Sequence, residues 1–78
     1  MKNLLIYDNG GKSYDRVTVI FKDRPEMKPN TFEAISACKT GDAFYQHTTA
    51  MPGRHLGKRV KFSDLSYELQ FKLSQEIL

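Results

Sequence analysis

Two short apolar runs on either side of a glycine turn constrain the fold of this chain more than any other feature. The runs Leu-Leu-Ile-Tyr and Arg-Val-Thr-Val-Ile-Phe-Lys flank Asp-Asn-Gly-Gly within residues 4–22. Asn and Gly adopt positive φ angles at low cost, so a chain reversal is expected at Asn9, Gly10 or Gly11. We therefore predict a β-hairpin with strands at about residues 3–8 and 15–22.

The second run alternates with the period of two that is typical of a strand. One face carries Val17, Val19 and Phe21, and the other carries Arg16, Thr18, Ile20 and Lys22. The sequence leaves the register open, because a tight turn pairs Leu5 with Tyr14 and a wider loop brings Tyr7 near Tyr14 or Arg16. We also expect Arg16 to pair with Asp8 across the hairpin.

The middle of the chain gives weaker signals. Two prolines predict an irregular connector at residues 23–30. Residues 31–37 fit a short strand or a helix that begins at Asn30, and we favour the strand. Residues 43–51 have no clear period and predict a short helical turn or an irregular loop. Residues 56–62 alternate and predict a strand with Val60 and Phe62 facing inward.

The C-terminal segment predicts an amphipathic helix. Ser63-Asp64 supplies a helix N-cap, and Asp64 and Glu68 place negative charge near the N-terminus of the helix. A core-facing stripe is formed by Leu65, Leu69, Leu73 and Ile77. Tyr67 and Phe71 lie four residues apart on the opposite side. Because a helix on a small sheet needs one apolar stripe, we predict that these two aromatics form an interface with a second copy or with a partner.

These patterns predict one α+β domain over residues 1–78. We expect a small antiparallel sheet of three or four strands built on the N-terminal hairpin, with one C-terminal helix packed on one face. The net charge of +3 permits an acidic partner without requiring one. Neither a membrane-spanning run nor a signal peptide is evident, and the single cysteine suits a reducing compartment, so we expect the protein in the cytoplasm.

The sequence offers few groups suited to catalysis or metal binding. Cys38, His47 and His55 do not have the spacing of a zinc site, and no nucleophile or acid–base constellation is evident. The segment at residues 8–13 contains glycines, a lysine and a hydroxyl, but it lacks the spacing of a phosphate-binding loop. We interpret it as a hairpin turn whose tip is a candidate binding loop. We therefore expect no enzymatic activity, no metal and no cofactor.

Two further segments are candidates for binding. A polar loop with an aromatic contains Tyr45, Gln46 and His47, and a basic cluster contains Arg54, His55, Lys58, Arg59 and Lys61. Such loops are common at ligand sites and equally common on ordinary surfaces. The basic cluster also fits a solvated edge strand that uses Lys and Arg against aggregation, so both interpretations stay open.

Three stretches carry a resemblance to a known group of proteins. They read Tyr7-Asp-Asn-Gly-Gly11, then Asp15-Arg16 leading into Thr18-Val-Ile-Phe21, then His55-Leu-Gly-Lys-Arg-Val-Lys-Phe-Ser-Asp-Leu65 followed by Glu68-Leu-Gln70. These stretches are similar to small, mostly uncharacterised proteins encoded by tailed bacteriophages. The similarity covers about half of the chain. Residues 23–51 depart from the pattern, and Ser66 stands where proline is expected.

The resemblance implies a phage or prophage origin and expression in the cytoplasm of a bacterial host. It brings no catalytic mechanism. We expect a non-catalytic phage accessory protein that binds and blocks a host protein or other macromolecule, inhibition of a bacterial defence system being one form. One alternative is a protein that sequesters a nucleotide-like small molecule, and another is a weak nucleic-acid binder.

Overall fold

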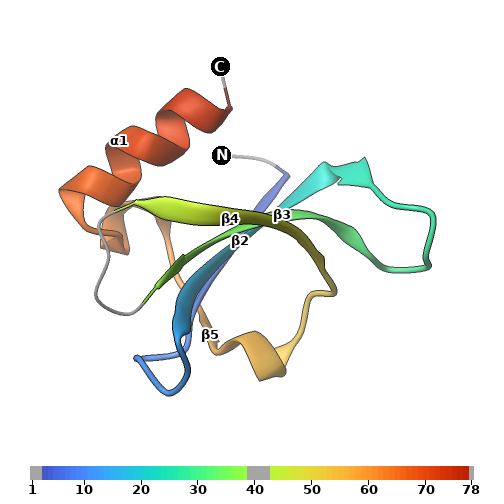
Figure 1. Cartoon of the computed structure of the whole chain (residues 1–78), viewed down its shortest axis with the longest axis horizontal. Coiled ribbons are helices and arrows are strands. Elements are labelled where there is room, and N and C mark those ends of the chain that lie inside the picture. Colours follow the sequence, from blue (N-terminus) through green and yellow to red (C-terminus); the bar gives the residue numbers. More distant parts are fainter. Residues whose placement is uncertain (1–2, 39–42, 78) are drawn as a thin grey trace.

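The computed structural model describes residues 3–38 and 43–77, and Figure 1 shows a single antiparallel sheet with a helix over one face. The described strands are β1 (Leu4–Asp8), β2 (Asp15–Pro25), β3 (Phe32–Cys38), β4 (Phe44–Ala50) and β5 (Lys58–Arg59). They form a 5-stranded sheet in the order β4-β3-β2-β1-β5. The α+β class and the single helix, α1 (Tyr67–Glu76), are confirmed, whereas the expected number of strands was too small.

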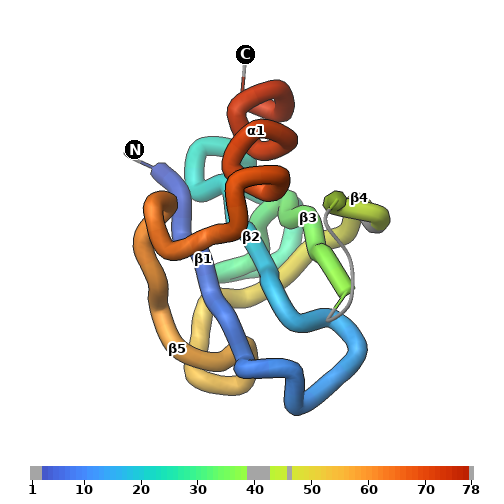
Figure 2. The backbone as a smooth tube through the Cα atoms, turned by 90° about the vertical axis from the view of Figure 1, so that its left-hand side faces the viewer, coloured from blue at the N-terminus to red at the C-terminus, as the bar shows by residue number. Residues whose placement is uncertain are grey.

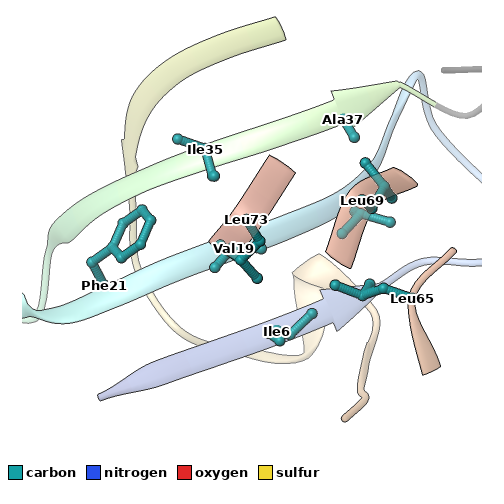
Figure 3. Close-up of a cluster of buried hydrophobic side chains, with 9 residues drawn as sticks. Ile6, Val19, Phe21, Ile35, Ala37, Leu65, Leu69 and Leu73 are labelled. Atoms are coloured by element: carbon teal, nitrogen blue, oxygen red, sulfur yellow. The ribbon is translucent and has the colours of Figure 1, made fainter. Parts of the chain in front are cut away.

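Strand β2 lies in the middle of the sheet, and both of its faces are buried. Toward the helix, Val17, Val19 and Phe21 pack in one apolar cluster, which Figure 3 shows with residues from neighbouring elements: Ile6, Ile35, Ala37, Leu65, Leu69 and Leu73. This confirms the predicted inward face of the second strand. Burial of this many aliphatic side chains makes the helix face the main core of the domain.

The opposite face of the sheet has a smaller core. Tyr7, Ile20 and Ala34 are buried there, and Leu56 packs against them. Leu56 belongs to a 3₁₀ turn, η1 (Arg54–Leu56), which crosses this face on the side away from α1 (Figure 1). The second face is therefore covered by a short crossing segment rather than by a helix.

The hairpin register differs from both alternatives that the sequence left open. Leu5 pairs with Ile20 and Tyr7 pairs with Thr18, so the loop between the strands is longer than a tight turn. Both Gly10 and Gly11 have positive φ angles, of 75° and 87°, as predicted. Hydrogen bonds inside the loop, described below, fix this longer connection.

Two segments that were predicted as irregular contain paired strands, although residues 26–30 of the connector are irregular as predicted. Strand β2 continues to Pro25 after a register shift, because Pro25 pairs with Phe32 at the end of β3. The prediction of an irregular segment at residues 43–51 was wrong, because β4 pairs along β3. β4 is an edge strand, and its polar residues give no alternating apolar pattern for the sequence to show. The preferred strand at residues 31–37 is confirmed.

The C-terminal half also starts its elements later than predicted. Only Lys58–Arg59 is a strand in the segment at residues 56–62. Asp64 belongs to a second 3₁₀ turn, η2 (Phe62–Asp64), where its carboxylate accepts a hydrogen bond of 2.9 Å from the Lys61 amide. The N-cap of α1 is Ser66, whose hydroxyl accepts from the Leu69 amide. The prediction that Ser63-Asp64 caps the helix was therefore wrong.

The helix presents its leucines to the sheet. Leu65, Leu69 and Leu73 are buried as predicted, but Ile77 at the end of the helix is 38% exposed and does not complete the stripe. Among the described residues, no helix has the length and apolar character needed to cross a bilayer.

A close backbone contact at Gly57 fixes the crossing segment against the hairpin. Gly57 has a φ of 109°, and a Cβ placed on it would lie 2.5 Å from both Asn9 Cα and the Asp8 carbonyl oxygen. Its amide donates to the Arg54 carbonyl, and the next two residues pair with β1 as strand β5. No side chain fits between these backbones, so glycine is required here.

We expect Gly57→Ala to lower the free energy of unfolding by at least about 2 kcal/mol, since it combines backbone strain with a clash. Gly10→Ala is the matched control, because Gly10 also has a positive φ but has open space around it. That control should lower the free energy of unfolding by about 1 kcal/mol. Denaturant unfolding measures both variants, and equal losses would show that the close contact does not constrain the fold.

Candidate functional site

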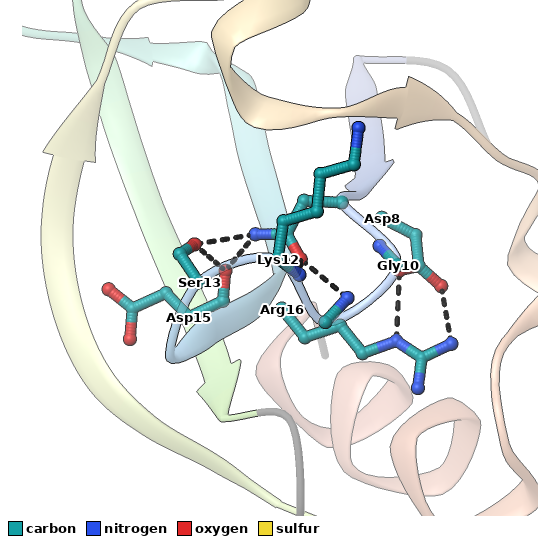
Figure 4. Close-up of polar contacts among 8 residues, drawn as sticks. Asp8, Gly10, Lys12, Ser13, Asp15 and Arg16 are labelled. Atoms are coloured by element: carbon teal, nitrogen blue, oxygen red, sulfur yellow. Dashed lines mark hydrogen bonds and ion pairs between the residues drawn. The ribbon is translucent and has the colours of Figure 1, made fainter.

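The loop between β1 and β2 is organised by the side chain of Asn9. Its Oδ1 accepts hydrogen bonds from the amides of Gly11 at 2.8 Å and Lys12 at 3.1 Å. Its Nδ2 donates to Ser13 Oγ and to the Asp15 carbonyl, both at 2.7 Å. Figure 4 shows these bonds gathered inside the loop. An asparagine that mimics a backbone turn in this way holds a loop in one shape.

This network engages the amides that a phosphate-binding loop would present. The Gly10 amide donates to the Asp8 carboxylate at 2.8 Å, and the Gly11 and Lys12 amides donate to Asn9. An anion bound by backbone amides would have to displace these acceptors, one of which is itself negative. The loop therefore does not resemble a phosphate cradle, and its structure fits the interpretation as a hairpin turn.

The predicted cross-hairpin pair between Arg16 and Asp8 is confirmed. Arg16 Nε lies 2.9 Å from Asp8 Oδ1, and Nη2 lies 3.4 Å from Oδ2 (Figure 4). Partial burial would raise the pKa of Asp8, but hydrogen bonds from Arg16 and Gly10 and the charge of Arg16 outweigh it and hold the pKa below its ordinary value. Asp8 is thus an ionised group that already has its counter-charge.

A hollow of about 1200 Å³ opens between the hairpin loop, η1 and β5. Figure 2 shows the hairpin loop and the Arg54–Leu56 turn at the same end of the molecule. We call this the basic hollow, and its lining residues are Tyr7, Asp8, Asn9, Gly10, Lys12, Ser13, Gly53, Arg54, His55, Gly57, Lys58, Arg59 and Val60. The fold thus brings together most of the predicted hairpin tip and the predicted basic cluster apart from Lys61.

Four cationic side chains line the basic hollow: Lys12, Arg54, Lys58 and Arg59. Within the described parts of the chain, the ion pairs closer than 4.0 Å join Arg16 to Asp8, Arg24 to Glu33 and His47 to Glu76, so none of the four has a carboxylate partner. The Arg59 guanidinium instead lies over the Tyr7 ring, 5.7 Å from its centre. The hollow therefore has an uncompensated positive charge.

A second, smaller pocket of about 270 Å³ lies beside the basic hollow, between the second face of the sheet and η1. It is lined by Asn9, Ser13, Asp15, Thr18, Ser36, Thr48, Thr49, Ala50, His55 and Leu56. We call it the hydroxyl pocket, because Ser and Thr residues make up much of its lining. Asn9, Ser13 and His55 line both spaces, so the two are neighbours.

The predicted loop of Tyr45, Gln46 and His47 lies elsewhere. These residues belong to β4, which is the edge strand farthest from β5. The Tyr45 hydroxyl donates to the Asp15 carboxylate, and His47 Nε2 lies 3.3 Å from Glu76 Oε1 in α1. The prediction that this segment is a loop was wrong, and neither Tyr45 nor His47 lines the basic hollow. Neither Gly11 nor Arg16 lines it either.

Several site residues were missed from the sequence. Lys12 was noted only as part of a rejected phosphate loop, and Thr18 and Ser36 were treated as ordinary strand residues. For Thr18 and Ser36, the sequence signal is a hydroxyl side chain within a strand. Many strands contain such a side chain, so it does not indicate a site. The part of the chain that the structure describes holds no group of three or more His, Cys, Asp or Glu residues placed to bind a metal.

We expect Asn9→Ala to lower the free energy of unfolding by about 1–3 kcal/mol, because it leaves loop amides without acceptors. Asn9→Asp keeps the acceptor oxygen and loses the donor. It should therefore lower the free energy of unfolding by less than Asn9→Ala does. Urea unfolding of both variants measures the effect. An alanine variant as stable as the original chain would show that the loop does not depend on this side chain.

The chain was also compared with known proteins. No family model, no curated protein and no solved structure matches it. The case for a function therefore comes from the contacts and charges of the molecule itself.

Proposed function

We propose that this protein is a non-catalytic binding protein that captures an anionic ligand in the basic hollow. The observation that carries the proposal is the convergence of Lys12, Arg54, Lys58 and Arg59 on one hollow without a carboxylate partner among the described residues. Like charges held together repel one another, and an anionic ligand relieves that repulsion. Walls around the charges also focus their field on a bound anion.

The rigid parts of the hollow support binding over a merely solvated surface. Lys58 and Arg59 are held in register with Asp8 and Tyr7 of β1, and the Gly57 contact fixes the turn before them. A short edge strand with exposed Lys and Arg would also protect the sheet against aggregation. Protection alone does not require Lys12 and Arg54, which come from two other segments, to line the same hollow.

The setting of this function follows from the phage resemblance. In a bacterial host, capture of an anionic component would block the process that depends on it, and a defence system is one such process. A single-stranded nucleic acid is the polymeric form of such a ligand. Its binding would weaken steeply with salt, because each neutralised phosphate releases a counterion.

Reversal of Arg54, Lys58 and Arg59 to Glu should lower capture of anionic species at least about tenfold while the fold is kept, because all three side chains are exposed. The measurement is recovery from bacterial lysate on immobilised protein, with mass spectrometry of small molecules and detection of nucleic acid and protein in the same eluate. The matched control reverses Lys22, Lys28 and Lys72, which are also exposed and lie outside the hollow.

The two triple variants replace the same number of positive charges with negative ones. Loss of capture only in the hollow variant supports the proposal. Equal capture by the two variants, whether reduced or not, would assign the basic cluster to solubility or to general charge.

A second candidate function is a protein contact through α1, and it is favoured by the exposure of two aromatics. Tyr67 is 77% exposed and Phe71 is 58% exposed, and they lie four residues apart on the helix face that points away from the sheet. Exposed aromatic pairs are common at interfaces. The partner would be a host protein or a second copy of the chain.

Tyr67→Ala combined with Phe71→Glu should leave the melting temperature within a few degrees, because neither ring is in the core. The same double variant should abolish self-association or partner binding, measured by light scattering and by the lysate capture above. Met27→Glu, at a fully exposed apolar position outside α1, is the control. An unfolded double variant would place the aromatics in the core, and unchanged association would place the interface elsewhere.

A further inference from the structure

The hydroxyl pocket contains two buried hydroxyl groups that have no partner among the described residues. Thr18 and Ser36 face each other across β2 and β3, and their residues are 5% and 4% exposed. Neither side-chain oxygen forms a hydrogen bond with another group in residues 3–38 or 43–77, yet neither is sealed from solvent. Both residues line the hydroxyl pocket. Buried polar groups normally have partners, so these hydroxyls are available to a ligand or to water.

The surroundings of the two hydroxyls are polar on one side and apolar on the other. Asp15, Thr48 and His55 contribute polar groups to the wall, and Ala50 and Leu56 contribute apolar surface. A flat polar ring with donors and acceptors at its edge suits such a wall. The volume of about 270 Å³ accommodates one ring rather than an extended chain.

The charges determine which part of a ligand lies in the hollow and which part lies in the pocket. The four cations line the basic hollow, and among the described residues no Lys or Arg lines the hydroxyl pocket beside it. An anionic group is therefore attracted to the hollow rather than to the pocket. His55 lines both spaces and lies where the two parts of a ligand would join.

We propose that the hydroxyl pocket and the basic hollow form one site for a small phosphorylated molecule that places one polar ring system, a base or a sugar, in the pocket; mononucleotides and sugar phosphates are molecules of this kind. The phosphate lies in the hollow among Lys12, Arg54, Lys58 and Arg59, and the ring hydrogen-bonds to Thr18 and Ser36 in the pocket. This proposal depends on the proposed function, since it specifies the anionic ligand that the hollow captures.

A nucleic-acid strand fits the site less well. Proteins that track single strands offer exposed aromatic rings on which successive bases stack. Tyr7, the aromatic that lines the hollow, is 6% exposed and has the Arg59 guanidinium over its ring. The hydroxyl pocket is also bounded on one side by the crossing segment that contains Leu56. The geometry therefore favours one ring over a series of bases.

The test is an NMR titration of the full chain, which gives dissociation constants from the shifts of backbone amides. The probes are AMP, GMP, CMP and UMP, each used separately, with ribose 5-phosphate as the probe without a base and inorganic phosphate as the anion alone. At least one ring-bearing probe should bind about tenfold more tightly than inorganic phosphate. The backbone amides whose shifts change on binding of this probe should include residues of both β2 and β3. Equal affinity for every probe and for inorganic phosphate would overturn the proposal.

The same set of probes shows whether the ring in the pocket is a base or a sugar. If ribose 5-phosphate binds as tightly as the best nucleotide, the pocket holds the sugar and the ligand is a sugar phosphate. If only nucleotides gain affinity, the pocket holds the base. Both outcomes support a site that binds a phosphate in the hollow and a ring in the pocket.

Removal of the two hydroxyls separates this proposal from the proposed function. Thr18→Val with Ser36→Ala keeps nearly the same shape, and it should weaken the best ring-bearing probe about tenfold while changing inorganic phosphate less than twofold. Ser74→Ala on α1, where the hydroxyl bonds to the Gln70 carbonyl, is the control and should change neither. A melting curve checks that each variant is folded.

The outcomes identify which proposal fails. If phosphate binding is lost on reversal of Arg54, Lys58 and Arg59 but the hydroxyl variant binds the ring-bearing probe like the original chain, the pocket proposal is wrong and anion capture stands. If inorganic phosphate and every ring-bearing probe bind equally to the original chain and to the charge-reversed variant, the basic hollow is not the anion site and both proposals are wrong.

Discussion

The close backbone contact between Gly57 and the start of the hairpin loop is the constraint on which the rest of this structure depends. The chain leaves β4 at one edge of the sheet and must return to the other edge to form β5. The Gly57 contact ends that crossing against Asp8 and Asn9, and the Val60 amide then donates to the Ile6 carbonyl at 2.9 Å. The crossing segment is thus held at the far edge, and the second face of the sheet is covered.

The two faces of the sheet differ because one helix cannot cover both. The α1 face is filled by leucines, other aliphatic side chains and Phe21, which pack closely together. The other face is crossed by a short segment in which Leu56 supplies the apolar contact. A segment this short leaves part of the face open, and Thr18 and Ser36 lie at that opening. The candidate site therefore follows from the small size of the domain as much as from its individual residues.

The sequence predicts the elements that have a strong local signal. Alternation of Val17, Val19 and Phe21 gave the central strand and its inward face, and the spacing of Leu65, Leu69 and Leu73 gave the helix. Polar edge strands carry no such period, so β4 was missed. The helix N-cap was misplaced because Ser63-Asp64 and Ser66 are both suitable caps, and η2 uses the first of them.

The candidate site was only partly predictable, for a physical reason. The basic cluster and the hairpin tip are recognisable from residue types, but their meeting depends on the Gly57 contact between segments far apart in the sequence. The hydroxyl pocket has no local signal, because Thr18 and Ser36 become neighbours only through the register of β2 and β3. Pairing partners of this kind are determined by the whole sheet.

The two parts of the site suit different roles in recognition. Long Lys and Arg side chains in the basic hollow attract an anion over a distance and adapt to its position, and their effect decreases with salt. Thr18 and Ser36 are short side chains on the two best-packed strands, so their hydroxyls are held in place. A site that must hydrogen-bond a ligand discriminates strongly against analogues that lack the matching groups, because its own polar groups are then left unpaired. In the proposed function, the hollow therefore contributes mainly to the rate and strength of anion capture, and the hydroxyl pocket selects among anions.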